Sequence, residues 1–215
     1  MTTSVRSSLG ERLVDHVSAK AASLQARYRN NDSTAVAELA ILRRGVSQRV
    51  GEDAALAGSV LGGLYENPAA LPDEVQPAER AAYAALTLFA VHQQSHRGAS
   101  MHRPGYSLGR SARLLGRHSG AQDAVRRRFT ALATATTWDE TMHHARGLVQ
   151  QLRAFGIPLD YGRFARDLLD LQSQDRADRV RLVWGRHFYR VRHAEDDAES
   201  DGGTVAETDD TTNDA

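Results

Sequence analysis

The segment that most constrains the fold is AERAAYAALTLFAVHQQSH at residues 78–96, directly after Pro77. Its spacing is helical, and its apolar residues lie nearly all round the helix rather than along one stripe. Such a helix has no side to present to water, so other elements must cover it. Proline suits the first turn of a helix, where no N–H donor is needed. The segment therefore predicts a central, buried helix.

Helical spacing recurs along the rest of the chain, and no convincing strand alternation is found. Prolines at 68, 72 and 77 predict a loop over residues 67–77, and a second loop is expected at 97–106. The other expected helices cover about 9–28, 33–50, 107–117, 119–135, 137–154, 160–172 and a last stretch ending near 189. The predicted fold class is all-α, a compact bundle of about eight helices in one body or two lobes.

Two of these helix starts carry a capping-box pattern. Ser119 precedes Gln122 by three residues, and Thr137 precedes Glu140 by the same spacing. In such a box the first side chain accepts a backbone N–H of the first turn, and the second side chain reaches back to the cap residue. The pattern predicts that helices begin at these two positions.

The formal net charge of zero conceals an uneven distribution. Residues 194–215 hold nine acids and no Lys or Arg, so residues 1–193 hold 27 bases against 18 acids, a balance of +9. The tail has Val205 as its only large apolar residue and cannot bury enough surface to offset its ordering entropy. We expect an all-α domain over 1–193 and a disordered acidic tail over 194–215.

Several classes of protein are disfavoured by what the sequence lacks. There is no cysteine, hence no disulfide framework and no thiolate metal site. Residues 1–20 lack the apolar run of a signal peptide, and no segment approaches about 18 apolar residues without charge. We therefore expect a cytoplasmic protein with no membrane partner.

Three arginines of SLGRSARLLGR at 107–117 form what we call the arginine ridge: Arg110, Arg113 and Arg117. On a helix they fall on the side opposite Leu108 and Leu115, and seven residues rise about 10 Å. A solvated face is one interpretation, but such faces usually mix charge signs, and no Asp or Glu occurs from Arg97 to Arg117. The alternative is contact with successive phosphates, for which the planar guanidinium is suited.

Other arginines allow both a structural and a binding role. In VRRRF at 125–129, Val125 and Phe129 belong to a buried stripe, so Arg127 points outward while Arg126 and Arg128 flank the stripe. Arg44 is expected to be more exposed than Arg43. Arg146 lies beside the apolar face of its helix, and a structural role is the alternative to binding there.

The histidines give only a weak indication of an enzyme. His92 and His96 have the spacing of a zinc-binding pair, but Gln93 stands where the metalloprotease pattern has its general base. No third ligand is apparent in the sequence, and no nucleophile motif or Gly-rich phosphate loop occurs. We expect these histidines to pack in the core or bond at the surface, with no catalytic residue, metal or cofactor.

Taken in order, a set of segments resembles the CasB family, the small subunit of the type I-E CRISPR surveillance complex Cascade. The similarity runs from about residue 36 to 192. The segments are AALTLFAVHQQS, MHRPGYSLGR, RRRFTALATA, HARGLVQQLR, IPLDYGRFARDLLDLQ and VRLVWGRHFYR.

The resemblance implies an all-α, non-catalytic subunit that is present as a pair along the guide-RNA filament. Its implied partners are a second copy, the backbone and large subunits, the guide RNA, and the target and displaced DNA strands, with another protein cutting the DNA. Members of this family bind nucleic acid through basic residues. The matching positions are Arg44, Arg110, one or more of Arg126 to Arg128, and Arg146. Adding the arginine ridge and its preceding turn gives the candidate nucleic-acid-binding residues Arg44, Arg103, Arg110, Arg113, Arg117, Arg126, Arg127, Arg128 and Arg146.

The sequence is consistent with three hypotheses on the function of the chain. The first is a subunit that tracks a strand by charge rather than by base stacking, because most of the aromatic residues lie on expected core stripes. The second is an architectural adaptor whose arginines meet acidic protein partners, and the third is a metal-dependent hydrolase using His92 and His96. For the tail, competition with nucleic acid and simple solubilisation are both open.

Overall fold

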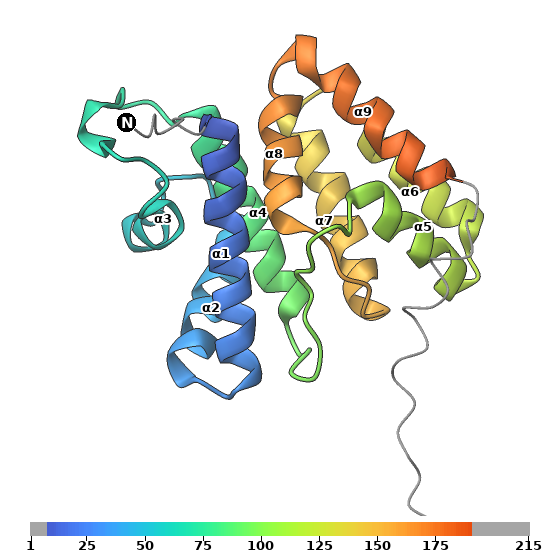
Figure 1. Ribbon diagram of the computed structural model, residues 1–215, viewed down its shortest axis with the longest axis horizontal. Coiled ribbons are helices and arrows are strands. Elements are labelled where there is room, and N and C mark those ends of the chain that lie inside the picture. The colour runs from blue at the N-terminus through green and yellow to red at the C-terminus, as the bar shows by residue number, and fades with distance from the viewer. Residues whose placement is uncertain (1–7, 191–215) are drawn as a thin grey trace, which may run out of the picture.

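The computed structural model describes residues 8–190, in which nine α-helices follow one another (Figure 1). The helices are α1 (Leu9–Arg29), α2 (Ser33–Gly45), α3 (Ala54–Leu61), α4 (Pro77–Gln93), α5 (Leu108–Ser119), α6 (Gln122–Thr134), α7 (Trp138–Ala154), α8 (Tyr161–Leu171) and α9 (Gln174–Tyr189), with a 3-10 turn at Pro68–Ala70. The described part contains no strand beyond one isolated bridge between His102 and Leu159. The all-α prediction is confirmed, whereas the tail at 194–215 lies outside the described residues.

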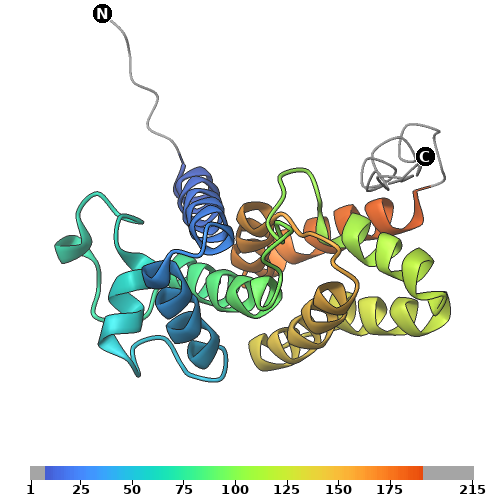
Figure 2. The same ribbon diagram turned by 90° about the horizontal axis from the view of Figure 1, so that it is seen from below.

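Helix α4 is the centre of the fold, as the sequence predicts. It packs against α1, α2, α3, α7 and α8, and every residue from Ala81 to Ala90 is buried. Helices α1 to α3 lie at one end of α4, and α5, α6 and α9 lie at the other end of the molecule (Figures 1 and 2). The buried apolar residues of both ends form one continuous core.

Helix α3 was not expected from the sequence. It is only eight residues long and buries two of them, Leu56 and Val60, which leaves too short a periodic pattern to recognise. Asp53 caps it by accepting the Leu56 N–H at 3.0 Å. The preceding helix ends at Gly45 rather than near 50, and the turn that follows leads the chain to α3.

Other helix boundaries also differ from the predicted ones. The predicted box at Ser119 is wrong, because Ser119 is the last residue of α5 and Gly120 ends that helix in the left-handed conformation. Thr137 does cap α7, although the Glu140 carboxylate accepts the N–H of Thr136 rather than that of the cap. Helix α4 ends at Gln93, because the Gln93 amide donates to loop carbonyls that follow it.

Tyr161, at the start of α8, joins several parts of the chain. Its hydroxyl shares a hydrogen bond of 2.9 Å with His92 Nδ1, and its backbone N–H donates to His102 Nδ1 at 3.1 Å. The side-chain amide of Gln25 in α1 bonds both backbone groups of His102, at 2.9 and 3.0 Å. Burial lowers the pKa of His92 to about 3, so its ring is neutral. These buried bonds fix the loop after α4 against α1 and α8.

Removing the Tyr161 hydroxyl tests this network. Tyr161→Phe leaves His92 Nδ1 without its partner in the core, so we expect the free energy of unfolding to fall by about 1–3 kcal/mol. Urea denaturation measures the change. Tyr189→Phe is the matched control, because the Tyr189 side chain is 62% exposed, and it should change the value by less than about 0.5 kcal/mol. Equal effects of the two substitutions would contradict the assigned role.

A second, partly buried polar contact joins α8 to α9. The fully buried Trp184 donates its indole N–H to Asp167 Oδ2 at 2.6 Å. Burial raises the pKa of Asp167 to about 6, and the Trp184 bond only partly offsets that effect. The folded chain therefore holds a proton at Asp167 over a pH range in which the unfolded chain has released it.

This carboxyl gives the stability a defined dependence on pH. Between about pH 4 and pH 6 the folded state binds the extra proton, so the free energy of unfolding should fall as the pH rises, by roughly 2–3 kcal/mol from this group. Asp167→Asn keeps an acceptor for Trp184 and removes the titration. The free energy of unfolding of this variant minus that of the natural chain should increase from pH 4 to pH 6 and then stay constant. Urea denaturation at each pH measures the difference. Parallel stability curves would contradict the assignment.

Candidate nucleic-acid interface

Helix α5 carries the arginine ridge. Ser107 caps the helix by accepting the Arg110 N–H at 3.4 Å, and the predicted apolar stripe that includes Leu108 and Leu115 is buried. The three ridge arginines lie on the other side, but they are half-buried rather than fully exposed. Helix α5 packs against α6, α7 and α9, Arg110 lies over the ring of Tyr106, and Arg113 donates to the carbonyl of Arg190.

Gly109 sets the distance between α5 and α9. A Cβ atom at this position would overlap the carbonyl oxygen of Trp184 and lie 2.9 Å from His187 Cβ. Only glycine allows the first turn of α5 to rest directly on the α9 backbone. Beside this contact, Ser107 Oγ and His187 Nδ1 share a hydrogen bond of 2.8 Å. The arginine ridge is thus carried on a firmly positioned helix.

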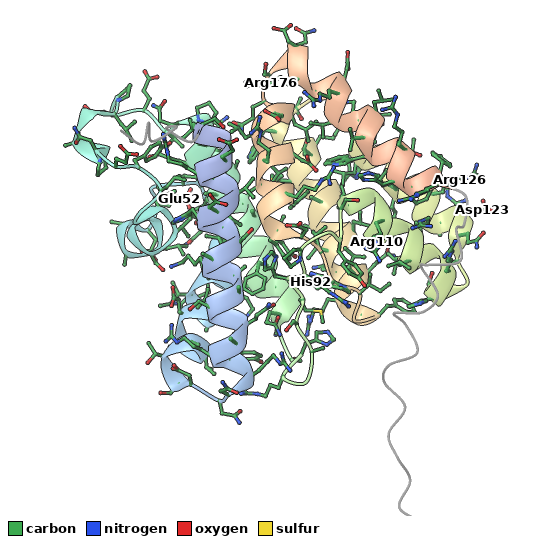
Figure 3. All side chains as sticks on the ribbon, in the orientation of Figure 1. Glu52, His92, Arg110, Asp123, Arg126 and Arg176 are labelled. Carbon is green, nitrogen blue, oxygen red and sulfur yellow. The ribbon has the colours of Figure 1, made fainter. Side chains whose placement is uncertain are left out.

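Two arginines flank the ring of Tyr106. The guanidinium carbon of Arg110 lies 4.1 Å from the ring centroid and that of Arg103 lies 5.0 Å from it. Both distances suit cation–π attraction. The backbone on which they sit is also fixed, since the Arg103 N–H donates to the Leu159 carbonyl and the Asp160 N–H donates to that of Tyr106. Arg110 is labelled in Figure 3.

Arg163 and Arg190 were missed by the sequence analysis. Burial first, and then the positive charges of Arg163, Arg190 and Arg113, lower the pKa of His187. Arg113 Nη1 also donates to the Arg190 carbonyl at 3.5 Å. Arg163 belongs to α8 and Arg190 follows α9, so only tertiary packing brings them to α5. We call the combined set the α5–α9 arginine cluster: Arg103, Arg110, Arg113, Arg117, Arg163 and Arg190.

The sequence that carries α5 and the loop before it is poor in acids. No Asp or Glu occurs between Glu79 and Asp123. Asp160 lies close by in the structure, but its carboxylate accepts the backbone N–H groups of Gly105 at 2.9 Å and Arg163 at 3.1 Å. Four arginines of the cluster thus come from an acid-free stretch of sequence, the Asp160 carboxylate is committed to backbone N–H groups, and Asp167 of α8 lies near Arg163.

Arg146 and Arg44 belong to a different surface. Arg146 of α7 donates to the carbonyl of Val46, just beyond the end of α2, so it has the structural role considered above. Arg44 is exposed in the last turn of α2, as predicted, and Arg43 is half-buried. Burial and the positive charge of Arg153 lower the pKa of Arg43. These four residues form the α2–α7 arginine group: Arg43, Arg44, Arg146 and Arg153.

The helices that carry the two sets of arginines lie on different sides of the molecule. Figure 2 shows α9 and the loop before α5 on one side of the molecule, with α7 on the other side. On helix α6, Val125 and Phe129 are buried as predicted, and Arg126, Arg127 and Arg128 are all exposed. Arg126 pairs with Asp123 at 3.0 Å, at the outer edge of the molecule (Figure 3). The nine predicted residues are thus distributed over three places.

The structure separates the two histidines of the HQQSH segment. Because α4 ends at Gln93, they do not lie four residues apart on one helix. His92 Nδ1 bonds Tyr161, and His96 Nε2 lies 2.8 Å from the Arg153 carbonyl. Among residues 8–190, no group of three or more His, Cys, Asp or Glu side chains is placed to hold a metal ion.

The described helices do not have the character of membrane spans. None of the helices between residues 8 and 190 combines the length and the apolar character that a bilayer span requires.

The family model of the CRISPR-associated protein Cse2 matches residues 38–189. The crystal structure of CasB from Thermobifida fusca is 34% identical, covers 83% of this chain and 98% of its own, and superposes with a TM-score of 0.70. A Cse2-family protein from Thermus thermophilus, 24% identical, shares the fold with a TM-score of 0.59 over 85% of this chain and 98% of its own. No protein of curated function matches the sequence.

His187 gives the cluster an expected response to pH. Its pKa is lowered by burial and by three arginines, and a bound phosphate would counter those charges and raise the pKa again. Binding should then take up a proton, so affinity for single-stranded DNA should increase as the pH falls from 7.5 to 5.5. Fluorescence anisotropy with the natural chain and His187→Gln measures this. The two proteins should differ most at pH 5.5, and equal pH profiles would contradict a phosphate near His187.

Proposed function

The chain belongs to the CRISPR-associated Cse2 family, the CasB small subunits of Cascade, and we propose that it stabilises the opened DNA of the target by arginine–phosphate contacts. In this proposal it has no catalytic role of its own. It acts in the cytoplasm, in antiviral defence, and holds the guide–target heteroduplex and the displaced strand while another protein cuts.

The α5–α9 arginine cluster is the observation that carries this proposal. The six arginines come from α5, α8, the loop before α5 and the residue after α9, and no Asp or Glu occurs in the sequence between Glu79 and Asp123. Guanidinium groups bind phosphates through paired N–H donors, and such contacts position a strand without reading its bases. This is the chemistry that a subunit needs when base pairing with a guide supplies the sequence specificity.

Aromatic stacking contributes little in this proposal. Among the large apolar side chains that are exposed in residues 8–190, the aromatic ones are Phe155, which follows α7, and Tyr189, the last residue of α9. A stacking groove would instead present successive aromatic rings along one strand. Charge is therefore the main source of binding, and the binding should depend steeply on salt.

The separation of the two arginine surfaces supports contact with two strands. Helix α9 and the loop before α5 lie on one side of the molecule and α7 lies on the other (Figure 2), so in this proposal the two sets of arginines meet different strands. Opening a duplex against a guide is nearly balanced in energy, and contacts to either product shift the balance. We propose that one surface meets the heteroduplex and the other meets the displaced strand. The remaining partners are a second copy of the chain and the backbone and large subunits.

A salt series tests the role of the arginine ridge. The variant Arg110→Gln, Arg113→Gln, Arg117→Gln removes three charges while keeping most of each side chain. Its affinity for labelled single-stranded DNA should fall, and the log–log salt slope should become shallower by roughly 0.7 per lost phosphate contact, or about 1.4–2 for two or three contacts. Circular dichroism verifies that the helix content is unchanged.

The matched control removes the same charge elsewhere. Arg80, Arg176 and Arg179 are exposed and lie outside both arginine surfaces, so their replacement by Gln should leave the slope nearly unchanged. Equal slopes for the natural chain and the ridge variant would overturn the role of the ridge. If the ridge variant also assembled into Cascade with unchanged target affinity, the chain would act as an architectural adaptor whose arginines meet acidic protein partners.

A further inference from the structure

The described chain ends beside its own arginine cluster. Helix α9 finishes at Tyr189, and the carbonyl of the next residue, Arg190, accepts a hydrogen bond from Arg113 of α5. The sequence that continues from this point contains the nine acids of residues 194–215. The acidic tail is therefore attached at the edge of the α5–α9 cluster.

Covalent geometry limits how far the first acids can be from the cluster. Glu195 is five residues beyond Arg190, a length of chain that spans at most about 18 Å. Asp196 and Asp197 follow directly. A tether of this length holds the carboxylates at a millimolar or higher effective concentration around the cluster. Helix α7, which carries part of the α2–α7 group, lies on the side of the molecule opposite α9 (Figure 2).

The charges are complementary in sign and in number. Residues 1–193 carry a balance of +9, and the tail carries nine acids with no Lys or Arg. Carboxylates accept the same paired N–H donors of arginine that phosphates do, so a run of acids presents a set of acceptors similar to a short nucleic-acid backbone. Neither the core nor the helix contacts of residues 8–190 require such a segment.

We propose that the acidic tail, residues 194–215, binds the α5–α9 arginine cluster in the same chain and competes there with nucleic acid. The proposal rests on the cluster being the nucleic-acid surface described above. A free nucleic-acid strand that contacts only the cluster must displace the tail. A strand held in the assembled complex has additional contacts and displaces the tail readily. The tail thus favours nucleic acid presented by the complex over free nucleic acid.

A cross-linking experiment tests the contact without nucleic acid. In the variant Arg113→Lys, a carbodiimide should join the introduced amine to a tail carboxylate, which mass spectrometry identifies. The yield should fall sharply at 1 M salt, where the Debye length is about 3 Å, because attraction rather than the tether alone produces the contact. Lys20 and Glu38, 3.0 Å apart, provide an internal positive control in the same sample. Arg176→Lys, at the start of α9, is the negative control.

A binding experiment tests the competition. Labelled single-stranded DNA is titrated into the full chain, a chain ending at His193, and a full chain with the nine acids replaced by Asn or Gln. Both altered chains should bind about tenfold more tightly at low salt, which is the factor expected when a millimolar effective concentration opposes a tail Kd of about 0.1 mM. The difference should vanish at high salt. In the arginine-ridge variant, deleting the tail should change affinity much less.

The outcomes separate this inference from the proposed function. Absence of the Arg113→Lys cross-link, with the Lys20–Glu38 link present, would overturn the tail contact whether or not DNA binds. A cross-link accompanied by equal DNA affinities of the full and shortened chains would overturn the competition and leave a solubilising tail. If no form of the chain bound DNA, alone or in the assembled complex, the proposed function would fail, while the cross-link would still report on the tail.

Discussion

The hydrogen bonds around Tyr161 are the constraint on which the rest of the structure depends. They join α1, α4, α8 and the loop before α5 through side chains that are buried and neutral. Because an unpaired polar group costs more in the core than at the surface, these bonds permit essentially one arrangement of the loop. That loop carries Arg103 and Tyr106 and leads directly to the cap of α5. The buried hydrogen bonds around Tyr161 therefore fix the position of the basic surface.

Much of the fold could be predicted from the sequence, because it follows from local periodicity. The central helix and the apolar stripe of α5 depend only on which side chains must leave water, and both are confirmed. Helix α3 escaped prediction because eight residues with two buried side chains leave little periodic signal. The ends of α2 and α4 escaped it because turns and side-chain amides in the folded chain decide where those helices stop.

The candidate site was only partly predictable. Spacing on one helix placed Arg110, Arg113 and Arg117 on a common side, but it could not show that they are half-buried in the folded chain. Arg163 and Arg190 approach α5 from elements that are distant in the sequence, so no local sequence pattern could predict their proximity. Arg146 is the opposite case. The sequence predicts it as a nucleic-acid-binding residue, but in the structure it donates a hydrogen bond to the Val46 carbonyl and joins α7 to the end of α2.

The close approach at Gly109 has a consequence for redesign of the surface. Backbone contact, rather than side-chain size, sets the separation of α5 from α9, so exchanges among the arginines leave the spacing of their Cα atoms unchanged. A wider separation, suited to a different spacing of phosphates, could be obtained by enlarging residue 109 with compensating changes in α9. The charge of this surface and the distance between α5 and α9 can thus be varied independently. Substitution of the arginines changes the charge, whereas adding a Cβ atom at residue 109 changes the distance.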